Sequence, residues 1–169
     1  PLTGGIFLAL WGCRKHSPEI NALFSLLTLL AAALLTHRII EDGPMTVGGG
    51  WFFIDSFNVF LVALTAFVAF TTALFSRPYM RIEAEHGKLN DKRLRLYHSS
   101  YQIFIAAMLL ALTTNNMGIL WVAMEAATLA TVLLVSLYRT PEAVEAAWKY
   151  FVLCGVGIAQ ALFGTVLLF

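Results

Sequence analysis

The chain has 169 residues, of which 59% are hydrophobic and only 12% are charged, and its formal net charge at pH 7 is +1. Soluble domains normally carry about a quarter charged residues, so this composition argues against a soluble enzyme. The small net charge, with no basic face, gives no indication of nucleic-acid binding.

Six apolar runs follow one another along the chain, and runs of about 20 residues predict helices that span a membrane. The first run is short, and the last is still apolar at the final residue, so we expect the chain to be part of something longer. The sequence therefore predicts an all-α integral membrane protein, a single membrane domain over residues 1–169. The expected transmembrane helices, about six in number, cover residues 2–13, 18–36, 57–75, 97–114, 116–138 and 141–169.

The connections between these runs have turn chemistry. A glycine-rich loop is expected over residues 43–50, followed by a short extended segment over 51–55. Asn115 and Asn116 divide a long apolar stretch into two spans, and Pro141 suits the first turn of the last helix because it has no amide hydrogen to leave unpaired. The two cysteines, Cys13 and Cys154, lack Cys-x-x-Cys spacing, and we expect free thiols.

Lysine and arginine residues collect in alternate loops. Nine of the eleven lie in the first, third and fifth connections, whereas the second and fourth hold only Arg38. Cytoplasmic loops of membrane proteins carry an excess of these residues. The sequence thus predicts that loops 1, 3 and 5 are cytoplasmic, in the inner (cytoplasmic) membrane of a bacterium. The nine residues are Arg14, Lys15, Arg77, Arg81, Lys88, Lys92, Arg93, Arg95 and Arg139.

The third connection, residues 77–96, is expected to be a cytoplasmic loop between helices 3 and 4. Its charges can serve as a docking surface for a cytoplasmic subunit or for anionic lipid headgroups. They can equally belong to an ordinary solvated loop, since the same charges already explain the orientation. The latter is the simpler interpretation. The four histidines lie in or near connections without ligand spacing, so we expect no metal site.

Glu125 is the only ionisable side chain within the apolar run 117–138. A charged, unpaired carboxylate inside a membrane costs several kcal/mol, and intramembrane acids are usually functional. Glu125 is therefore the first candidate for proton transfer. The alternative is a protonated carboxyl group that is hydrogen-bonded within the helix bundle.

Lys149 is the second intramembrane charge, and it lies eight residues after Pro141, about 12 Å along the helix. By the same count Glu125 is about 8 Å deeper, which two long side chains or one water can bridge. Such a pair can hold or release a proton, because burial and mutual attraction shift the two groups in opposite senses. Alternatively, Lys149 reaches toward the headgroups.

Thr128 follows Glu125 by one helical turn, and Gln160 adds a polar group to the last helix. Hydroxyl and amide groups of this kind can support water or hydrogen-bond across helices. We name Thr128 and Gln160 as candidates for lining a proton path.

Two segments carry a resemblance to a known family. Thr-Asn-Asn-Met-Gly-Ile-Leu-Trp-Val-Ala-Met-Glu over residues 114–125, followed by Glu-Ala-Val-Glu-Ala-Ala-Trp-Lys-Tyr-Phe over 142–151, resembles the antiporter-like subunits of complex I and its relatives. Tyr-Met-Arg over 79–81 and Glu-His-Gly-Lys-Leu over 85–89 are similar to the hydrogenase-4 component F branch, among the formate hydrogenlyases and other group 4 NiFe hydrogenases. The resemblance covers residues 51–169 well and the first fifty only in topology.

The resemblance implies a fold of about 14 helices with two inverted repeats, of which this chain supplies the N-terminal part. Glu125 matches the fifth-helix glutamate of the family, whose partner lysine lies beyond Phe169, as do the broken helix and the central lysine and histidine residues. Lys149 matches the lysine near the start of the sixth helix. Gly155 and Ile158 stand where some relatives carry an arginine and an acid.

The functional hypothesis is a proton-translocating subunit of a redox-driven membrane complex. We expect it to contact other membrane subunits, peripheral cytoplasmic redox subunits and the lipid bilayer, but no nucleic acid. The chain offers no residues to bind iron–sulfur clusters, flavin or nickel, so we expect no cofactor and no catalytic centre. The alternatives are a subunit of a cation/proton antiporter, a subunit of an inorganic-carbon uptake complex, and a non-pumping membrane anchor for a peripheral enzyme.

Overall fold

The computed structural model describes residues 1–11, 17–86 and 90–168, and Cys13, Arg14, Lys15, His16 and Lys88 lie outside this part. Nearly all of it is helical. The elements in chain order are α1 (Leu2–Trp11), α2 (Ser17–Asp42), β1 (Met45–Val47), β2 (Phe52–Ile54), α3 (Ser56–Glu85), α4 (Asp91–Thr113), α5 (Met117–Val135), the 3-10 turn η1 (Ser136–Tyr138) and α6 (Pro141–Leu168).

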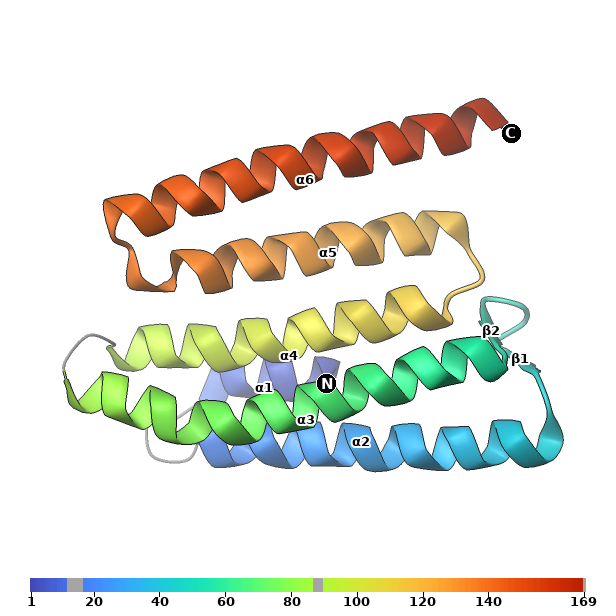
Figure 1. The fold of residues 1–169 in the computed structure, drawn as a ribbon, viewed down its shortest axis with the longest axis horizontal. Coiled ribbons are helices and arrows are strands. Elements are labelled where there is room, and N and C mark those ends of the chain that lie inside the picture. Colours follow the sequence, from blue (N-terminus) through green and yellow to red (C-terminus); the bar gives the residue numbers. More distant parts are fainter. Residues whose placement is uncertain (12–16, 87–89, 169) are drawn as a thin grey trace.

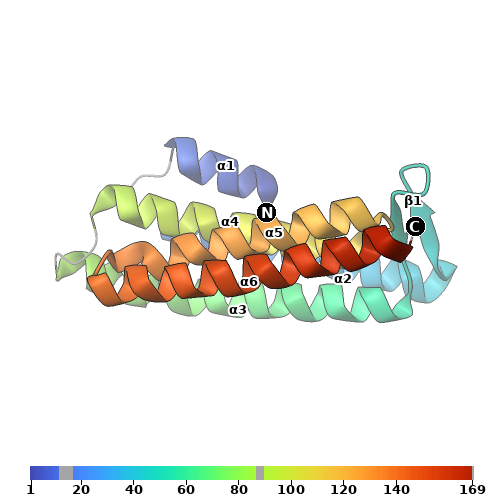
Figure 2. The same ribbon diagram turned by 90° about the horizontal axis from the view of Figure 1, so that it is seen from above.

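The five long helices run up and down beside one another (Figure 1). α2 and α3 form one side of the molecule, α4 and α5 follow, and α6 lies outermost against α5, while α1 packs on α4 (Figure 2). α2 to α6 are each long and apolar enough to cross a membrane, whereas α1 has only ten residues. The predicted all-α integral membrane architecture is confirmed.

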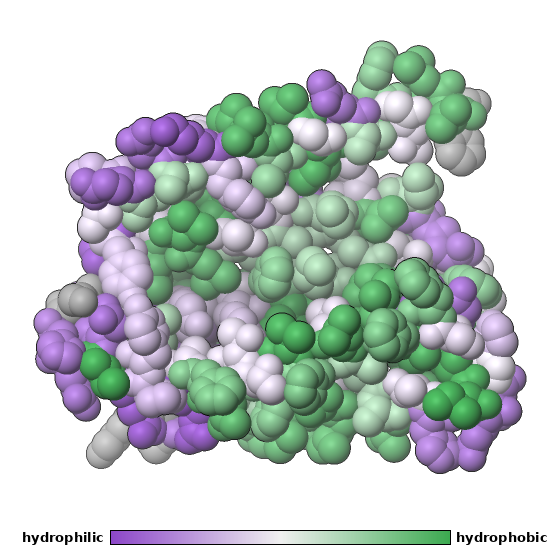
Figure 3. All heavy atoms as spheres, viewed as in Figure 1, coloured by the Kyte–Doolittle hydropathy of each residue, from purple (hydrophilic) through white to green (hydrophobic). Residues whose placement is uncertain are grey.

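The surface shows the same division. Hydrophobic residues cover the middle of the molecule, and hydrophilic residues gather at the two ends of the helices (Figure 3). Large apolar side chains stay exposed even where helices pack, among them Leu30, Phe67 and Leu153. A belt of this kind suits hydrocarbon on the outside, because each backbone polar group is already bonded within its own helix.

α2 is longer than predicted, ending at Asp42 rather than at residue 36. The additional turns are held by Ile39, which is 2% exposed and packs with Ile54 and Val59. Gly43 then ends the helix with a positive φ of 81°, and its amide bonds the carbonyl of Ile39 at 3.1 Å. The apolar pattern alone missed these turns because His37, Arg38, Glu41 and Asp42 are polar.

The expected 77–96 loop is wrong in its extent, because most of it is helical. α3 continues through Pro78 to Glu85, although a proline inside a helix removes one backbone hydrogen bond. Tertiary contacts offset this loss: Met80 is 4% exposed and packs with Leu94 and Leu137. At the other side, α4 starts six residues earlier than predicted, where the side chain of Asn90 accepts a bond from the next amide.

α5 starts one residue later than predicted, at Met117, and α6 starts where predicted. The side-chain oxygen of Asn116 accepts a hydrogen bond from the amide of Ile119 at 3.1 Å, capping α5. α6 begins at Pro141.

Between α3 and α4 the packing is close because small residues lie at the contact: Ala69 and Ala73 are buried against Tyr101.

The loop over residues 43–50 contains a strand that was not expected. β1 pairs antiparallel with β2, with Thr46 opposite Phe53, and three consecutive glycines with positive φ form the turn between them. The predicted extended segment is confirmed as β2. The amide of Asn115 donates to the carbonyl of Trp51 at 2.8 Å, so the hairpin also fixes the α4–α5 connection.

Candidate functional site

Glu125 lies eight residues inside α5, and its side chain is half-buried. Its neighbours line open apolar grooves: Ala126 faces one of about 520 Å³, and Met124 faces another of about 470 Å³ on the side of α6. Within the part of the chain that the structure describes, no hydrogen bond or ion pair of the Glu125 carboxyl group is seen. A charged, unpaired carboxylate inside a membrane is unfavourable, so this position calls for a partner group.

The threonines near Glu125 are bonded within α5. Thr128 is 6% exposed, and its hydroxyl donates to the carbonyl of Met124 at 3.1 Å. Thr131 does the same one turn later, with the carbonyl of Ala127 at 2.9 Å. Their hydroxyl hydrogens are thus engaged, while their oxygen lone pairs can still accept a bond from water.

Lys149 does not approach Glu125 in this structure. Its ammonium group lies 2.5 Å from a carboxylate oxygen of Glu145, one turn earlier in α6, and its side chain is 70% exposed. The indole nitrogen of Trp121 donates to the carbonyl of Ile158 at 3.2 Å, which sets the level of the two antiparallel helices. Glu125 is four residues after Trp121 on α5, and residue 154 is four residues before Ile158 on the antiparallel α6, so the two lie at the same depth. Lys149 is five residues from 154 and is therefore about 8 Å from Glu125 along the helix axis.

Gln160, the other predicted path residue, is exposed on α6. It is two residues from Ile158, beyond the level of Glu125. The described residues therefore bring Glu125 and Thr128 together on α5 and leave Lys149 and Gln160 on outer faces of α6. Cys154 is a free thiol and half-buried, as predicted for this cysteine.

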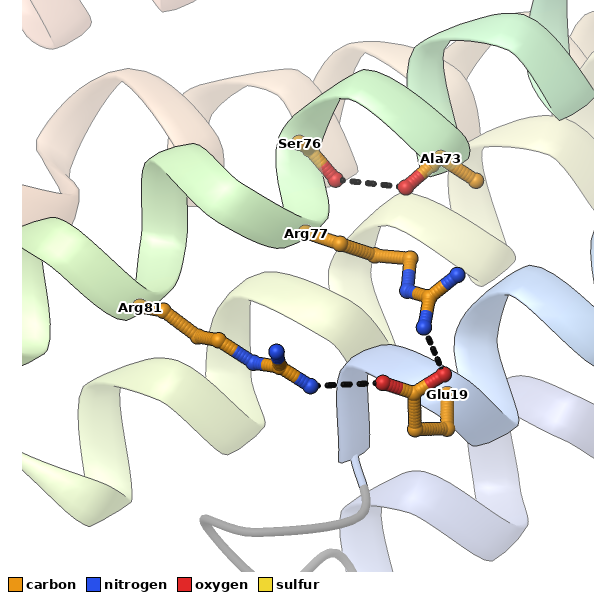
Figure 4. A network of polar contacts seen from close by, with 5 residues as sticks. All are labelled: Glu19, Ala73, Ser76, Arg77 and Arg81. Carbon is orange, nitrogen blue, oxygen red and sulfur yellow. Dashed lines mark hydrogen bonds and ion pairs between the residues drawn. The ribbon is translucent and has the colours of Figure 1, made fainter.

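Several basic residues of the predicted 77–96 loop bind other residues of the protein. Arg77 and Arg81 lie one turn apart on α3, and both bind the carboxylate of Glu19 in the first turn of α2 (Figure 4). The Arg81–Glu19 distance is 2.6 Å. This carboxylate also lies near the positive end of the α2 dipole, which favours a negative charge.

Two arginines of α4 bind the ends of other helices. Arg95 donates to the carbonyl of Ala9 at 2.6 Å, and Arg93 to that of Tyr138 at 3.4 Å. Carbonyl groups at the end of a helix have no partner of their own, and arginine supplies one. These charges thus hold helix ends together, a role that neither interpretation of the loop included.

A buried polar cluster was missed from the sequence. Asn21 and Ser25 of α2 face His98 and Gln102 of α4, and all four are at most 1% exposed. His98, expected beside a loop, is fully buried inside α4. The signal in the sequence was the spacing of four residues within each pair, which places both members on one face of a helix.

No group of three or more histidine, cysteine, aspartate or glutamate side chains able to hold a metal ion occurs among the described residues.

No protein-family model matches the chain. Over all its 169 residues, the chain is 46% identical to the hydrogenase-4 component F homologue of Methylacidiphilum infernorum (isolate V4), covering 34% of that protein. It is 26% identical over 152 residues to NADH-quinone oxidoreductase subunit N of Dehalococcoides mccartyi, which involves 88% of this chain and 29% of the relative. For subunit N of Ruthia magnifica the identity is 24% over 164 residues, 92% of this chain and 31% of the relative.

The chain thus spans about a third of the length of the curated relatives it matches. The predicted resemblance to antiporter-like membrane subunits of the complex I superfamily is confirmed, including the similarity to hydrogenase-4 component F.

Proposed function

We propose that the chain is part of a proton-translocating, antiporter-like subunit of a redox-driven membrane complex of the hydrogenase-4 or NADH-quinone oxidoreductase type. The observation that carries the proposal is Glu125, a single carboxyl group midway along an apolar helix. The similarity of the whole chain to hydrogenase-4 component F supports the assignment.

In the proposed mechanism Glu125 is neutral when no cation is near and ionised when a positive partner comes close. Apolar surroundings favour the neutral carboxyl group, and an approaching ammonium group favours the carboxylate. A positive partner that moves toward Glu125 therefore releases its proton, and one that moves away allows a proton to bind. Since Lys149 pairs with Glu145 on its own helix, it can reach Glu125 only by exchanging one carboxylate for the other.

The proposed orientation follows the basic residues. The end of α3, the start of α4 and the connection after η1 meet at one end of the bundle (Figure 1). Arg77, Arg81, Lys92, Arg93, Arg95 and Arg139 all lie there. We place that end on the cytoplasmic side of a bacterial inner membrane. The proposed partners are further membrane subunits and peripheral redox subunits, and the proposal is supported by relatives that are named as a component or a subunit of larger enzymes.

The test is proton uptake driven by electron transfer, in membrane vesicles that contain the complex with the full-length subunit. Glu125→Gln keeps the shape and polarity of the side chain but cannot release a proton. Glu142→Gln, an exposed position in the first turn of α6, is the matched control. We expect uptake to fall in Glu125→Gln and to persist in Glu142→Gln, with both complexes assembled.

A membrane anchor without transport gives the opposite result. In that case Glu125→Gln leaves uptake unchanged, while reversing a charge at the basic end, as in Arg139→Glu, detaches peripheral subunits. Arg139 suits this experiment because it lies in the exposed connection between η1 and α6. Assembly is read by native electrophoresis of the solubilised complex.

A further inference from the structure

Of the polar side-chain atoms of Asn21, Ser25, His98 and Gln102, some are hydrogen-bonded and others are not. The amide nitrogen of Gln102 donates to the side-chain oxygen of Asn21 at 2.8 Å and to the hydroxyl oxygen of Ser25 at 3.0 Å. It also lies 3.1 Å from the backbone carbonyl of Asn21. Both hydrogens of the Gln102 side-chain amide are therefore engaged. Because a backbone carbonyl can only accept, the contact with the Asn21 carbonyl fixes which end of the Gln102 amide is the nitrogen.

Four other polar atoms of this cluster have no partner among the described residues. They are the side-chain nitrogen of Asn21, the side-chain oxygen of Gln102, and both ring nitrogens of His98. His98, Asn21 and Gln102 are all 0% exposed. An unpaired buried polar group is unfavourable, so four such atoms on the facing sides of α2 and α4 call for a partner.

The unpaired atoms match the bonding capacity of water. The nitrogen of Asn21 is a donor, and the oxygen of Gln102 is an acceptor. A neutral imidazole adds one donor and one acceptor. Because the two ring nitrogens of His98 lie on opposite edges of the imidazole, they need one water molecule each, and buried waters typically make about three bonds to such groups. A bare cation fits less well, because the hydrogens of the Asn21 amide and the imidazole N–H would repel it.

We propose that two internal waters are bound between α2 and α4 by His98, Asn21 and Gln102, one at each ring nitrogen of His98, and that His98 passes protons from one water to the other. The exchange is balanced at the ring. A water that carries an excess proton gives it to the unprotonated ring nitrogen and returns to neutral water, and the proton on the other nitrogen leaves to the second water. The imidazole ends as the other neutral tautomer, so the site carries a proton without holding a permanent charge in the membrane.

The location gives this site a role separate from Glu125. His98 is seven residues from the start of α4, or about 10 Å from the basic end of the bundle. Counted back from the α4–α5 connection, Glu125 lies near the level of Ile105, about 10 Å deeper. The water site is thus at an entrance position. The proton-transfer half of the inference rests on the proposed function, while the binding of water does not.

The first experiment is a cryo-electron microscopy map of the complex with the full-length subunit, at a resolution that shows ordered waters. We expect a density peak within about 3.2 Å of each His98 ring nitrogen, one of them also within this distance of the Gln102 side-chain oxygen. The proposal is overturned if a side chain of another segment or subunit occupies either place, or if the map shows the cluster dry.

The second experiment separates the water from the proton. His98→Gln keeps groups that can bond water but cannot exchange protons as imidazole does, and His98→Leu removes both properties. The matched control is His37→Phe, because His37 is exposed and, within the described ranges, is bonded only to Glu41 on its own helix. We expect His98→Gln to keep the water peaks and to lower redox-driven uptake at least about tenfold, with uptake unchanged in His37→Phe.

Unchanged uptake in an assembled His98→Gln complex overturns the proton role of His98. If Glu125→Gln abolishes uptake in the same vesicles, the proposed function stands and only this inference falls. If neither substitution affects uptake, both fall together. His98→Leu covers the case in which His98→Gln does not assemble, because an assembled His98→Leu complex with full uptake overturns the proposal equally.

Discussion

Replacing Gln102 by leucine tests how much the buried polar cluster contributes to packing α2 against α4. Leucine is similar in size, so the substitution removes polar contacts without leaving a large cavity. The side-chain amide makes three contacts to α2, at 2.8, 3.0 and 3.1 Å. Hydrogen bonds between membrane helices contribute about 0.6 kcal/mol each on average. The amide has two hydrogens to share among these acceptors, so the lost hydrogen bonds amount to about 1 kcal/mol.

Two further effects of Gln102→Leu add to this loss. The acceptors of Asn21 and Ser25 lose their donor, and one proposed internal water loses its bond to the oxygen of Gln102. We thus expect the free energy of unfolding to fall by at least about 1 kcal/mol. The measurement is steric trapping or detergent titration of the full-length protein in bicelles.

The control for this prediction is Thr71→Val. The hydroxyl of Thr71 bonds only carbonyl groups of its own helix, those of Phe67 and Val68. We expect a change within about 0.5 kcal/mol, as is usual away from cores and networks. If Gln102→Leu changes the free energy of unfolding no more than Thr71→Val, the argument that the cluster joins α2 to α4 is refuted.

Three other substitutions probe the packing in the same assay. Gly4→Ala places a methyl group 2.7 Å from a ring carbon of Phe24, and overpacking of this kind costs about 1–3 kcal/mol; equal stability of the variant would show that α1 is not held at this distance. Tyr101→Phe removes a hydroxyl that donates to the carbonyl of Ala69 at 2.6 Å, so we expect a loss of about 1 kcal/mol, and a gain in stability would contradict it. Glu19→Gln weakens both contacts to arginine on α3; because these side chains are partly exposed, we expect at most about 1 kcal/mol, shrinking in 1 M salt, and a salt-independent loss would point to packing instead.

The predictable part of the fold depends on features that are local in sequence. Pro141 and Asn116 mark the starts of α6 and α5 because a missing amide hydrogen and a capping side chain act on their own turn. The apolar runs are long enough to require spanning helices regardless of their neighbours.

The unpredicted part depends on contacts between segments that are far apart. Pro78 is a reasonable place to end a helix, and α3 passes through it because Met80 and two arginines find partners on other helices. For the same reason the sequence predicts a solvated loop for the basic residues after Pro78. Their charge alone does not show which carbonyl or carboxylate group of another helix lies nearby.

The candidate site was predicted in part. Glu125 is an acid in an apolar run, which one segment is enough to show. The separation of Lys149 from Glu125 depends on the rotation of α6 about its axis, which apolar periodicity leaves open when most of the helix is apolar. The cluster around His98 depends on two helices facing each other, and only the spacing of four residues hinted at it.

The most direct test of the account is the number of protons taken up per electron transferred, measured in vesicles that contain the complex with the full-length subunit. The account predicts that Glu125→Gln lowers this ratio while the electron-transfer rate and assembly remain those of the wild type. The same ratio in wild type and Glu125→Gln would contradict it, because Glu125 would then be a structural carboxyl group and the chain would not transfer protons through α5.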